Sequence, residues 1–329
     1  MTTPVDYAVV VPTIGRACLA DCLRALAAGA GPRPAEVVVV DDRPGAEDGL
    51  PLGPVGALPV RVVATGGRGP AAARNAGARA VGATWVVFLD DDVQVSPDWA
   101  ERLAEDLAGA DDRTGGVQGR LTVPLPEDRR PTDWERGTAG LEAAAWATAD
   151  MAYRATTLKE VGGFDERFPR AFREDADLAL RVMDAGWSLR RGRRVTLHPV
   201  RPAGPWASVR AQRGNADDVL MNRLHGRDWW TRGEAPRGRL PGHLATTALA
   251  CAAVLGMATR RRRSAALAAS LWAAATAEFA WARIAPGPRT RHEVATMVAT
   301  SVAIPPLAVR HWFAGQIRHR GVRPPGGAR

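Results

Sequence analysis

Apolar residues in the first two hundred positions come in short runs separated by segments with helical spacing. Continuous apolar runs are typical of parallel strands buried on both faces, and positions three and four apart indicate amphipathic helices. The expected strands are 6–11, 36–40, 60–64, 85–89, 117–123, 149–154 and 195–198. The expected helices are 17–28, 71–81 and 97–107, with two more beginning near 156 and 173. Alternating strands and helices predict an α/β fold with a mostly parallel, helix-covered sheet.

Acidic residues directly follow two of these strands. Asp41 and Asp42 end the second, and Asp90, Asp91 and Asp92 end the fourth. In parallel sheets, ligands bind beyond the carboxyl ends of the strands. Three adjacent carboxylates repel one another and are held together by a positive partner, for which a divalent metal is the simplest. The plain alternative is a solvated acidic turn.

The C-terminal part contains three further apolar stretches, 242–259, 264–282 and 294–309. Each is near the lower limit of about 20 residues for a bilayer span. If the first stretch crossed from the cytoplasm, Arg260–Arg263 would be exported, against the positive-inside tendency. We therefore expect helices that lie in the membrane interface, or a hairpin that dips into it, with transmembrane helices and a soluble helical cap as alternatives.

The net charge of +9 conceals a division of the chain. Residues 1–185 carry 20 basic and 29 acidic side chains (net −9), and residues 186–329 carry 24 and 6 (net +18). A basic, apolar C-terminal part suits an anionic membrane surface. No nucleic-acid-binding motif accompanies the positive charge, so no nucleic-acid partner is expected. We expect a domain over 1–235 and a basic helical region over 236–329.

Cysteine content and the N-terminal residues indicate the compartment. The three cysteines form no disulfide framework, which suggests a reducing environment. The first ten residues lack the basic and apolar regions of a signal peptide. We expect a cytoplasmic protein at the inner face of the plasma membrane.

Six motifs in fixed order carry a family resemblance. They are V-V-V-P-T-I-G-R (9–16), V-V-V-V-D-D (37–42), A-R-N-A-G (73–77), F-L-D-D-D (88–92), V-G-G-F-D-E (161–166) and R-E-D-A-D-L (173–178). Over about 5–200 the chain resembles the family 2 glycosyltransferases of GT-A fold. The resemblance implies a mostly parallel Rossmann-like sheet. It also implies inverting transfer of a sugar from a nucleotide-diphosphate sugar with Mg²⁺ or Mn²⁺.

The resemblance also suggests roles for individual residues. Asp92 is the expected metal ligand, Asp90 its metal or ribose companion, and His198 a further ligand; a histidine at a strand end is otherwise an ordinary surface residue. Asp175 is the expected catalytic base, with Glu174 beside it, although acids here also suit the helix dipole. The expected donor contacts are Thr13, Asp41, Asp42, Arg74, Asp90 and Asp91. The expected acceptor contacts are Phe164, Asp165 and Glu166.

The acceptor and the class of enzyme rest on further observations. The Q-x-x-R-W motif of processive members is absent after Gln212, which favours transfer of a single sugar. The apolar C-terminal part suggests a cell-envelope or lipid-linked glycan acceptor. Residues 67–72 match G-x-G-x-x-A, so an NAD(P)-binding Rossmann enzyme is an alternative, although Pro70 removes an amide from that turn. A non-catalytic membrane-associated scaffold that retains the fold is another.

Overall fold

The computed structural model describes residues 5–45 and 48–323. The chain forms two compact units. Unit 1 comprises Met1–Pro124, Ala139–Val200 and Arg232–Ala235, and unit 2 comprises Leu125–Thr138, Arg201–Thr231 and Pro236–Arg329. Residues 125–138 and 201–231 thus group with the C-terminal helices. The expected boundary between a domain over residues 1–235 and a basic helical region over 236–329 stays a prediction.

Unit 1 is built on one eight-stranded sheet with the order β3-β2-β1-β4-β7-β6-β8-β5. The strands are β1 (Tyr7–Thr13), β2 (Val37–Asp41), β3 (Val60–Ala64), β4 (Trp85–Leu89), β5 (Gln94–Val95), β6 (Thr114–Thr122), β7 (Asp150–Arg154) and β8 (Ser188–Leu197). β3, β2, β1 and β4 are mutually parallel. β7 runs antiparallel to both β4 and β6, and β6 is parallel to β8.

Helices cover both faces of this sheet because the central strands are apolar on both sides. Val9, Val11, Val37 and Val39 pack with α1 (Cys18–Ala28) and α3 (Trp99–Ala108). Val10, Val38 and Val40 face the other side, where α2 (Pro70–Ala80), α5 (Ala155–Glu160) and α6 (Glu174–Asp184) contribute to the core. The mostly parallel, helix-covered α/β sheet expected from the apolar runs is confirmed.

A buried ion pair joins the antiparallel part of the sheet to α3. Asp150 at the start of β7 and Arg194 in β8 are both 0% exposed, and Arg194 Nε donates to Asp150 Oδ1 at 2.8 Å. Asp150 Oδ2 accepts from Trp99 Nε1 at 2.8 Å and from Thr196 Oγ1 at 2.6 Å. Arg194 Nη2 donates to the Val117 carbonyl at 2.8 Å. This network is satisfied by unit 1 itself and stabilises the sheet.

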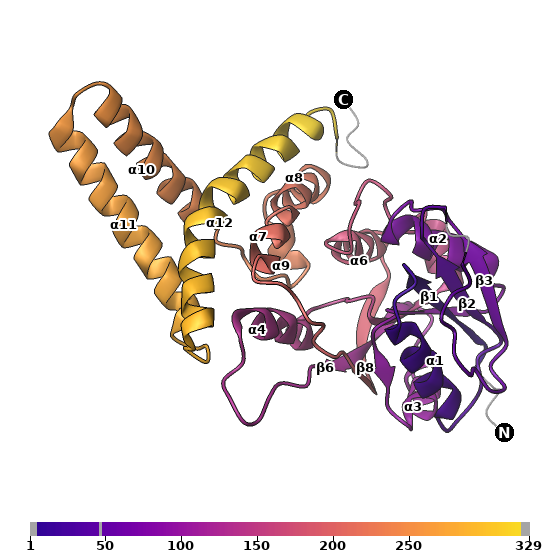
Figure 1. Cartoon of the computed structure of the whole chain (residues 1–329). Helices are drawn as coiled ribbons and strands as arrows, with labels where there is room; N and C mark the ends of the chain where they lie inside the picture. Colours follow the sequence, from indigo (N-terminus) through magenta and orange to yellow (C-terminus); the bar gives the residue numbers. More distant parts are fainter. Residues whose placement is uncertain (1–4, 46–47, 324–329) are drawn as a thin grey trace. The chain divides into compact units, whose positions relative to one another are not determined.

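Unit 2 is helical. It contains α4 (Asp133–Ala139, except its last residue), α7 (Ala207–Ala211), α8 (Gly214–His225), most of α9 (Trp229–Arg232), α10 (Leu240–Ala258), α11 (Arg262–Ile284) and α12 (Arg291–Arg318). The short 3-10 helix η1 (Gly140–Ala143) follows α4 and belongs to unit 1. α10 and α11 pack as a hairpin, with Arg260 and Arg261 in the turn (Figure 1). α12 packs on both of them and on α8, and it continues through Pro305 and Pro306.

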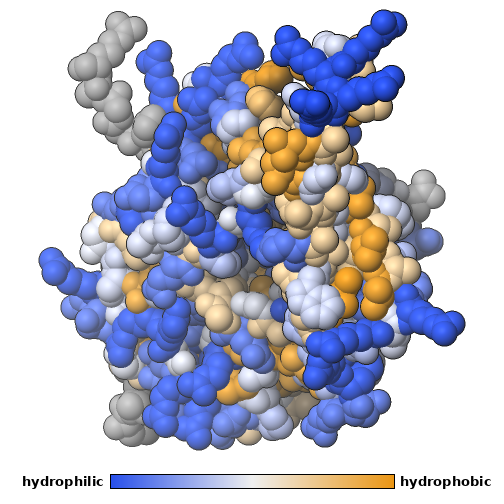
Figure 2. All heavy atoms as spheres, turned by 90° about the vertical axis from the view of Figure 1, so that its left-hand side faces the viewer, coloured by the Kyte–Doolittle hydropathy of each residue, from blue (hydrophilic) through white to orange (hydrophobic). Residues whose placement is uncertain are grey.

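Each of the three long helices is long and apolar enough to cross a membrane. Only 17% of the apolar window of α10 and 22% of that of α11 is buried, against 44% for α12. Val254, Leu255, Met257 and Leu267 are each more than 60% exposed. Figure 2 shows this apolar surface along the side on which the hairpin lies, with hydrophilic side chains gathered at its ends.

A buried arginine holds part of unit 2 together. Arg283 of α11 is 7% exposed and donates to Asp133 Oδ2 of α4 at 2.7 Å. It also donates to Ser208 Oγ of α7 at 2.8 Å and to Thr300 Oγ1 of α12 at 2.8 Å. One side chain therefore ties residues 125–138 and 201–231 to the long helices.

Candidate active site

The carboxyl ends of β1, β2 and β4 bring the acidic motifs to one edge of the sheet. β1 is parallel to both neighbours and in register with them, so Thr13, Asp41 and the residues after Leu89 lie at the same edge. The two acidic clusters, which are separate in sequence, thus meet at the edge where ligands bind in such folds.

Asp91 is the middle acid of its cluster and faces the protein. It is 1% exposed, and Oδ2 accepts from Thr13 Oγ1 at 2.6 Å. Oδ1 accepts from Arg16 Nη1 at 2.7 Å. Asp91 and Thr13 therefore hold the loop after β1, and Arg16, to which the sequence analysis gave no role, joins them. In the sequence, only the position of Arg16 within the V-V-V-P-T-I-G-R motif pointed to a role for this residue.

Asp42 organises the loop that leads into α2. Its Oδ1 accepts from Thr65 Oγ1 at 2.7 Å and from the Arg68 amide at 2.8 Å, and Oδ2 accepts from the Gly69 amide at 2.8 Å. In a dinucleotide-binding turn these amides would face a pyrophosphate. Since Asp42 already occupies them, the geometry of the G-x-G-x-x-A segment argues against the NAD(P) alternative.

Asp41 has a partner of its own. Arg43 Nε and Nη2 donate to its two carboxylate oxygens at 2.9 and 2.7 Å. Hydrogen bonding to Arg43 holds the pKa of Asp41 below its usual value. Asp41 and Asp42 both have hydrogen-bond partners within the protein. Their expected contact with the nucleotide-sugar donor stays a prediction.

Asp90, Asp92 and His198 converge. One ligand atom from each lies within 4.8 Å of the others. His198 follows β8, where its amide donates to the Thr122 carbonyl at 2.8 Å, and its Nε2 lies 3.8 Å from Asp92 Oδ1. The ring is 6% exposed, and its buried Nδ1 has no hydrogen-bond partner among the described residues. Two carboxylate oxygens and one imidazole nitrogen form a donor set that fits Mn²⁺ or Mg²⁺.

Arg74 lies beneath this cluster. It is 2% exposed, and its Nη2 donates to Asp90 Oδ1 at 2.8 Å while Nη1 donates to Glu174 Oε1 at 2.7 Å. One guanidinium thereby links α2, the end of β4 and the start of α6. The side chain points at carboxylates, so its expected contact with the donor stays a prediction.

The first turn of α6 presents Glu174 and Asp175. Glu174 is 2% exposed, whereas Asp175 is partly exposed and accepts from the Ala176 amide at 2.7 Å. Burial raises the pKa of Asp175, and the Asp90 carboxylate adds to this effect. Burial, followed by the Asp175 carboxylate, also raises the pKa of Glu174, against the effect of Arg74.

Backbone strain marks the same helix start. Arg173 precedes α6 with φ of 77°, a left-handed conformation that costs a residue other than glycine about 1–3 kcal/mol. Such strain clusters at functional sites. It persists here because α6 is packed into the core of unit 1.

The expected acceptor loop lies against α2. Phe164 is 3% exposed and packs edge-on against Phe88 with ring centroids 5.1 Å apart, so its side chain is part of the core. Asp165 pairs with Arg167, and Glu166 pairs with Arg68 and accepts from Asn75 Nδ2 at 3.0 Å. The loop is present as expected, but Phe164 positions it from within and does not face solvent.

Asn75 holds this loop in place, a role that the sequence analysis did not assign. Its Nδ2 donates to the Phe164 carbonyl at 2.9 Å, and its Oδ1 accepts from the Phe164 amide at 2.8 Å. A Cβ on Gly163, whose φ is +71°, would lie 2.5 Å from Asn75 Oδ1. The clamp therefore requires glycine at 163. The available signal was the position of Asn75 within A-R-N-A-G.

Comparisons with known proteins agree with these observations. Residues 8–159 match the family model described as glycosyl transferase family 2. Two Mycobacterium tuberculosis proteins, from strains CDC 1551 and H37Rv, are named pre-mycofactocin glycosyltransferase. Each is 34% identical over 137 residues, which cover 37% of this chain and 28% of the relative. The similarity thus spans little more than a quarter of the length of these curated relatives.

A solved structure extends the likeness of fold. It is the mannosyltransferase PcManGT from Pyrobaculum calidifontis in complex with GDP-Man and Mn²⁺, with a TM-score of 0.58 and 22% sequence identity. The alignment covers 95% of this chain and 88% of that one. With the six ordered motifs and the sheet they build, these similarities lead to one conclusion. Residues 8–159 match glycosyltransferase family 2, and the chain shares the GT-A fold of a solved glycosyltransferase.

Proposed function

We propose that this chain is an inverting, metal-dependent glycosyltransferase. It would transfer a single sugar from a nucleotide-diphosphate sugar to a cell-envelope or lipid-linked glycan acceptor. The observation that carries this proposal is the convergence of Asp90, Asp92 and His198 at the edge of the sheet. Arg74 connects that cluster directly to the turn that bears Asp175.

Asp90, Asp92 and His198 would hold Mg²⁺ or Mn²⁺, which stabilises the negative charge that develops on a departing diphosphate. Asp175 would accept the proton of the acceptor hydroxyl while the hydroxyl oxygen attacks the anomeric carbon and the bond to the diphosphate breaks. A raised pKa makes Asp175 a stronger base than an exposed aspartate. Arg74 and Glu174 would position it. Asp165 and Glu166 would contribute to the acceptor side.

Replacement of the proposed base tests this assignment. We expect Asp175→Asn to lower transfer by at least about 100-fold, the lower end of the contribution of general bases, with Mn²⁺-dependent binding of the nucleotide diphosphate retained. Asp21→Asn, at an exposed acid of α1, is the matched control and should transfer normally. Unchanged transfer by Asp175→Asn would remove Asp175 from the mechanism. Complete absence of transfer by the wild-type chain with all donors would favour a scaffold.

The donor is best identified by binding. A thermal-shift screen of UDP, GDP, CDP and ADP, each with and without Mn²⁺, should show one preferred base and a dependence on the metal. Stabilisation by NAD(P) in place of all four would overturn the assignment of the donor class. The acceptor can then be sought with the corresponding sugar nucleotide.

We also propose that unit 2 attaches the protein to the cytoplasmic face of an anionic membrane. The support is the exposed apolar surface of α10 and α11 together with Arg260–Arg263 between them. α10 has 19 residues and is therefore about 28 Å long, close to the hydrocarbon thickness of about 30 Å. A fully inserted hairpin of this length would carry Arg260–Arg263 to the far face, so α10 and α11 would lie in the interface or dip only partly into it, with these arginines against the anionic headgroups.

Carbonate extraction of membranes separates these arrangements. An inserted hairpin should stay in the pellet at high pH, whereas interfacial helices or a soluble cap should be released. Recovery of the whole protein in the soluble fraction before any wash would contradict membrane attachment.

A further inference from the structure

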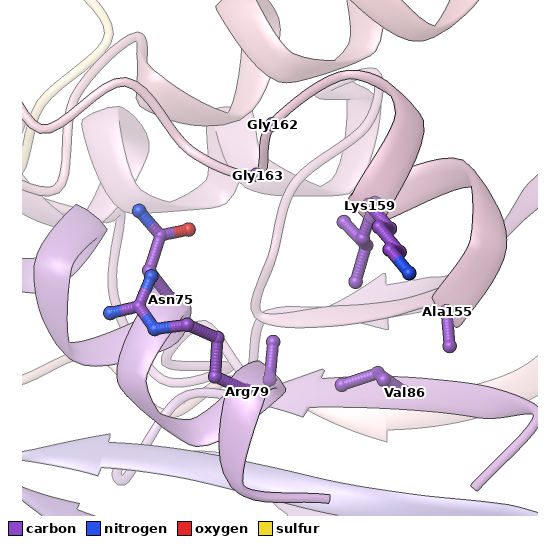
Figure 3. A pocket seen from close by; sticks show the side chains of 9 residues that line it. Asn75, Arg79, Val86, Ala155, Lys159, Gly162 and Gly163 are labelled. Carbon is purple, nitrogen blue, oxygen red and sulfur yellow. The ribbon is translucent and has the colours of Figure 1, made fainter. Parts of the chain in front are cut away.

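Unit 1 contains a hollow away from the acidic edge of the sheet. It lies between α2 and α5 and encloses about 440 Å³. Figure 3 shows Asn75 and Arg79 on the α2 side, Ala155 and Lys159 on the α5 side, and Val86 of β4 between them. None of the three candidate metal ligands lines it.

The inner surface of the hollow is apolar and belongs to the core. Val86 is 1% exposed and Leu158 is 6% exposed, and both are part of the core cluster on this face of the sheet. Ala78 and Ala155 add small side chains on the two walls, which keeps the space open. A guest that entered would remove apolar surface from water, which is favourable at about 25 cal/mol per Å².

The charged side chains of the hollow are both basic. Arg79 and Lys159 are exposed, and neither forms an ion pair with a residue that the structure describes. No acidic side chain lines the space. Other arginines of unit 1 pair with carboxylates, for example Arg74 with Glu174 and Arg181 with Asp177. Two cations without ion pairs beside one apolar space are therefore a distinct arrangement.

We propose that this hollow binds a small organic anion with an apolar body, such as an aromatic carboxylate or phosphate monoester. Its volume falls within the range of about 300–1,000 Å³ that is usual for small-molecule sites. The apolar body would contact Val86 and Leu158, and the anionic group would pair with Arg79 and Lys159. The site does not depend on the proposed transfer reaction.

Lys159 makes the proposal directly testable, because it is the only lysine in the sequence. A succinimidyl ester of acetate modifies lysine, and mass spectrometry of the intact full-length protein and its peptides measures the rate. The probes are 2-naphthoate and 2-naphthyl phosphate, with uncharged 2-naphthylmethanol and inorganic phosphate as comparisons. The α-amino group of the purified chain is the internal control.

We expect each naphthyl anion to slow modification of Lys159 about tenfold at ten times its Kd, since only the free protein reacts. The α-amino group should react at an unchanged rate. Protection by only one of the two anions would still support the site and would identify its head group. Equal protection by 2-naphthylmethanol or by phosphate alone would overturn the proposal.

Variants locate the protection. Arg79→Gln removes one cation and should raise the concentration needed for protection about tenfold, as expected for a lost charge-assisted contact. Ala78→Leu fills the space and should abolish protection while Lys159 stays reactive. Arg113→Gln, at an exposed arginine that does not line the hollow, is the matched control and should behave as wild type. Wild-type protection in both hollow variants would exclude this site.

Discussion

Arg74 joins three elements of unit 1 through its guanidinium. It is enclosed between Asp90 and Glu174, and the two terminal nitrogens of its planar guanidinium each donate to one of these carboxylates. The single ammonium group of a lysine could not reproduce this geometry. Loss of one member of a buried pair leaves the other charge uncompensated, which is costlier than loss of a surface pair. Arg74 therefore couples the stability of the N-terminal domain to the geometry of the candidate metal cluster.

The proposed role of Asp175 as the base predicts a pH dependence of transfer. A base works when it is deprotonated, and burial raises the pKa of this carboxyl. We therefore expect kcat/KM to fall on acidification at a higher pH than the ordinary value of about 3.9 would give. A pH profile measures this. Arg173 lowers the pKa of Asp175, so Arg173→Gln should move the acid limb further up; a limb at the ordinary value would contradict the assignment.

The raised pKa of Asp175 also affects how the stability of the folded protein depends on pH. A carboxyl whose pKa is raised in the folded state contributes stability that is fully present below its unfolded pKa. That contribution is lost as the pH rises through the folded pKa. The raised pKa values of Asp175 and Glu174 therefore make the folded protein less stable when these carboxyls are deprotonated, the form in which the proposed base Asp175 would act.

His198 is the residue of the cluster whose replacement tests metal binding most simply. Replacing a residue that only supports a metal ligand typically weakens metal binding about 10-fold or more. We expect His198→Gln, which removes a candidate ligand itself, to weaken Mn²⁺ binding at least as much. Titration calorimetry with the full-length protein measures the change. His292→Gln, at an exposed histidine of α12, serves as the control. An unchanged Kd would remove His198 from the ligand set.

Among the elements, β7 and β8 are held by the ion pair of Asp150 and Arg194. Asp150→Asn removes the shorter ion pair of Arg194 and leaves Asp106, 3.2 Å from Arg194 Nη1, as its counter-charge. We therefore expect a loss of about 1.5–3 kcal/mol in the stability of unit 1, as for a buried hydrogen bond to a charged group. Denaturant unfolding measures this loss. Arg191→Gln, at an exposed arginine of the same strand, should change stability by less than about 1 kcal/mol. Equal stability of the Asp150 variant would show that the network is dispensable.

The sequence predicted the parallel half of the sheet well because its strands are short apolar runs. β3 was expected at 60–64 and lies there, and β1, β2 and β4 differ by at most two residues at an end. The antiparallel insertion of β7 between β4 and β6 was not predictable, since strand pairing depends on contacts distant in sequence. β8 begins seven residues before the expected 195, because residues 188–194 are mostly polar and contain no apolar run.

The candidate site was predictable to a different degree for each residue. Asp90, Asp92 and His198 were expected together, and the structure brings them together. The partners of Arg74 and the burial of Phe164 were not visible, because both depend on how α2 and the 161–166 segment pack in the core. A motif identifies which residues matter, but only packing shows which way each side chain points.

At the scale of the whole molecule, charge and apolar surface lie in the same part of the chain. The four arginines 260–263 sit where α10 gives way to α11. Each basic side chain near an anionic membrane contributes about 1 kcal/mol. Replacing all four by glutamine should therefore weaken binding to vesicles with anionic lipid by at least about 100-fold. Vesicle co-sedimentation measures it, and an equal effect on neutral vesicles would point to misfolding.

The way the two units alternate along the chain limits how the protein can be divided. Residues 125–138 and 201–231 belong to unit 2, although residues of unit 1 precede and follow each of them. Arg283 supplies the buried counter-charge for Asp133 and a partner for Ser208. A gene truncated after codon 235 would therefore encode two segments without their packing partners. Transplanting unit 1 onto another helical region would mean exchanging three separate stretches of sequence.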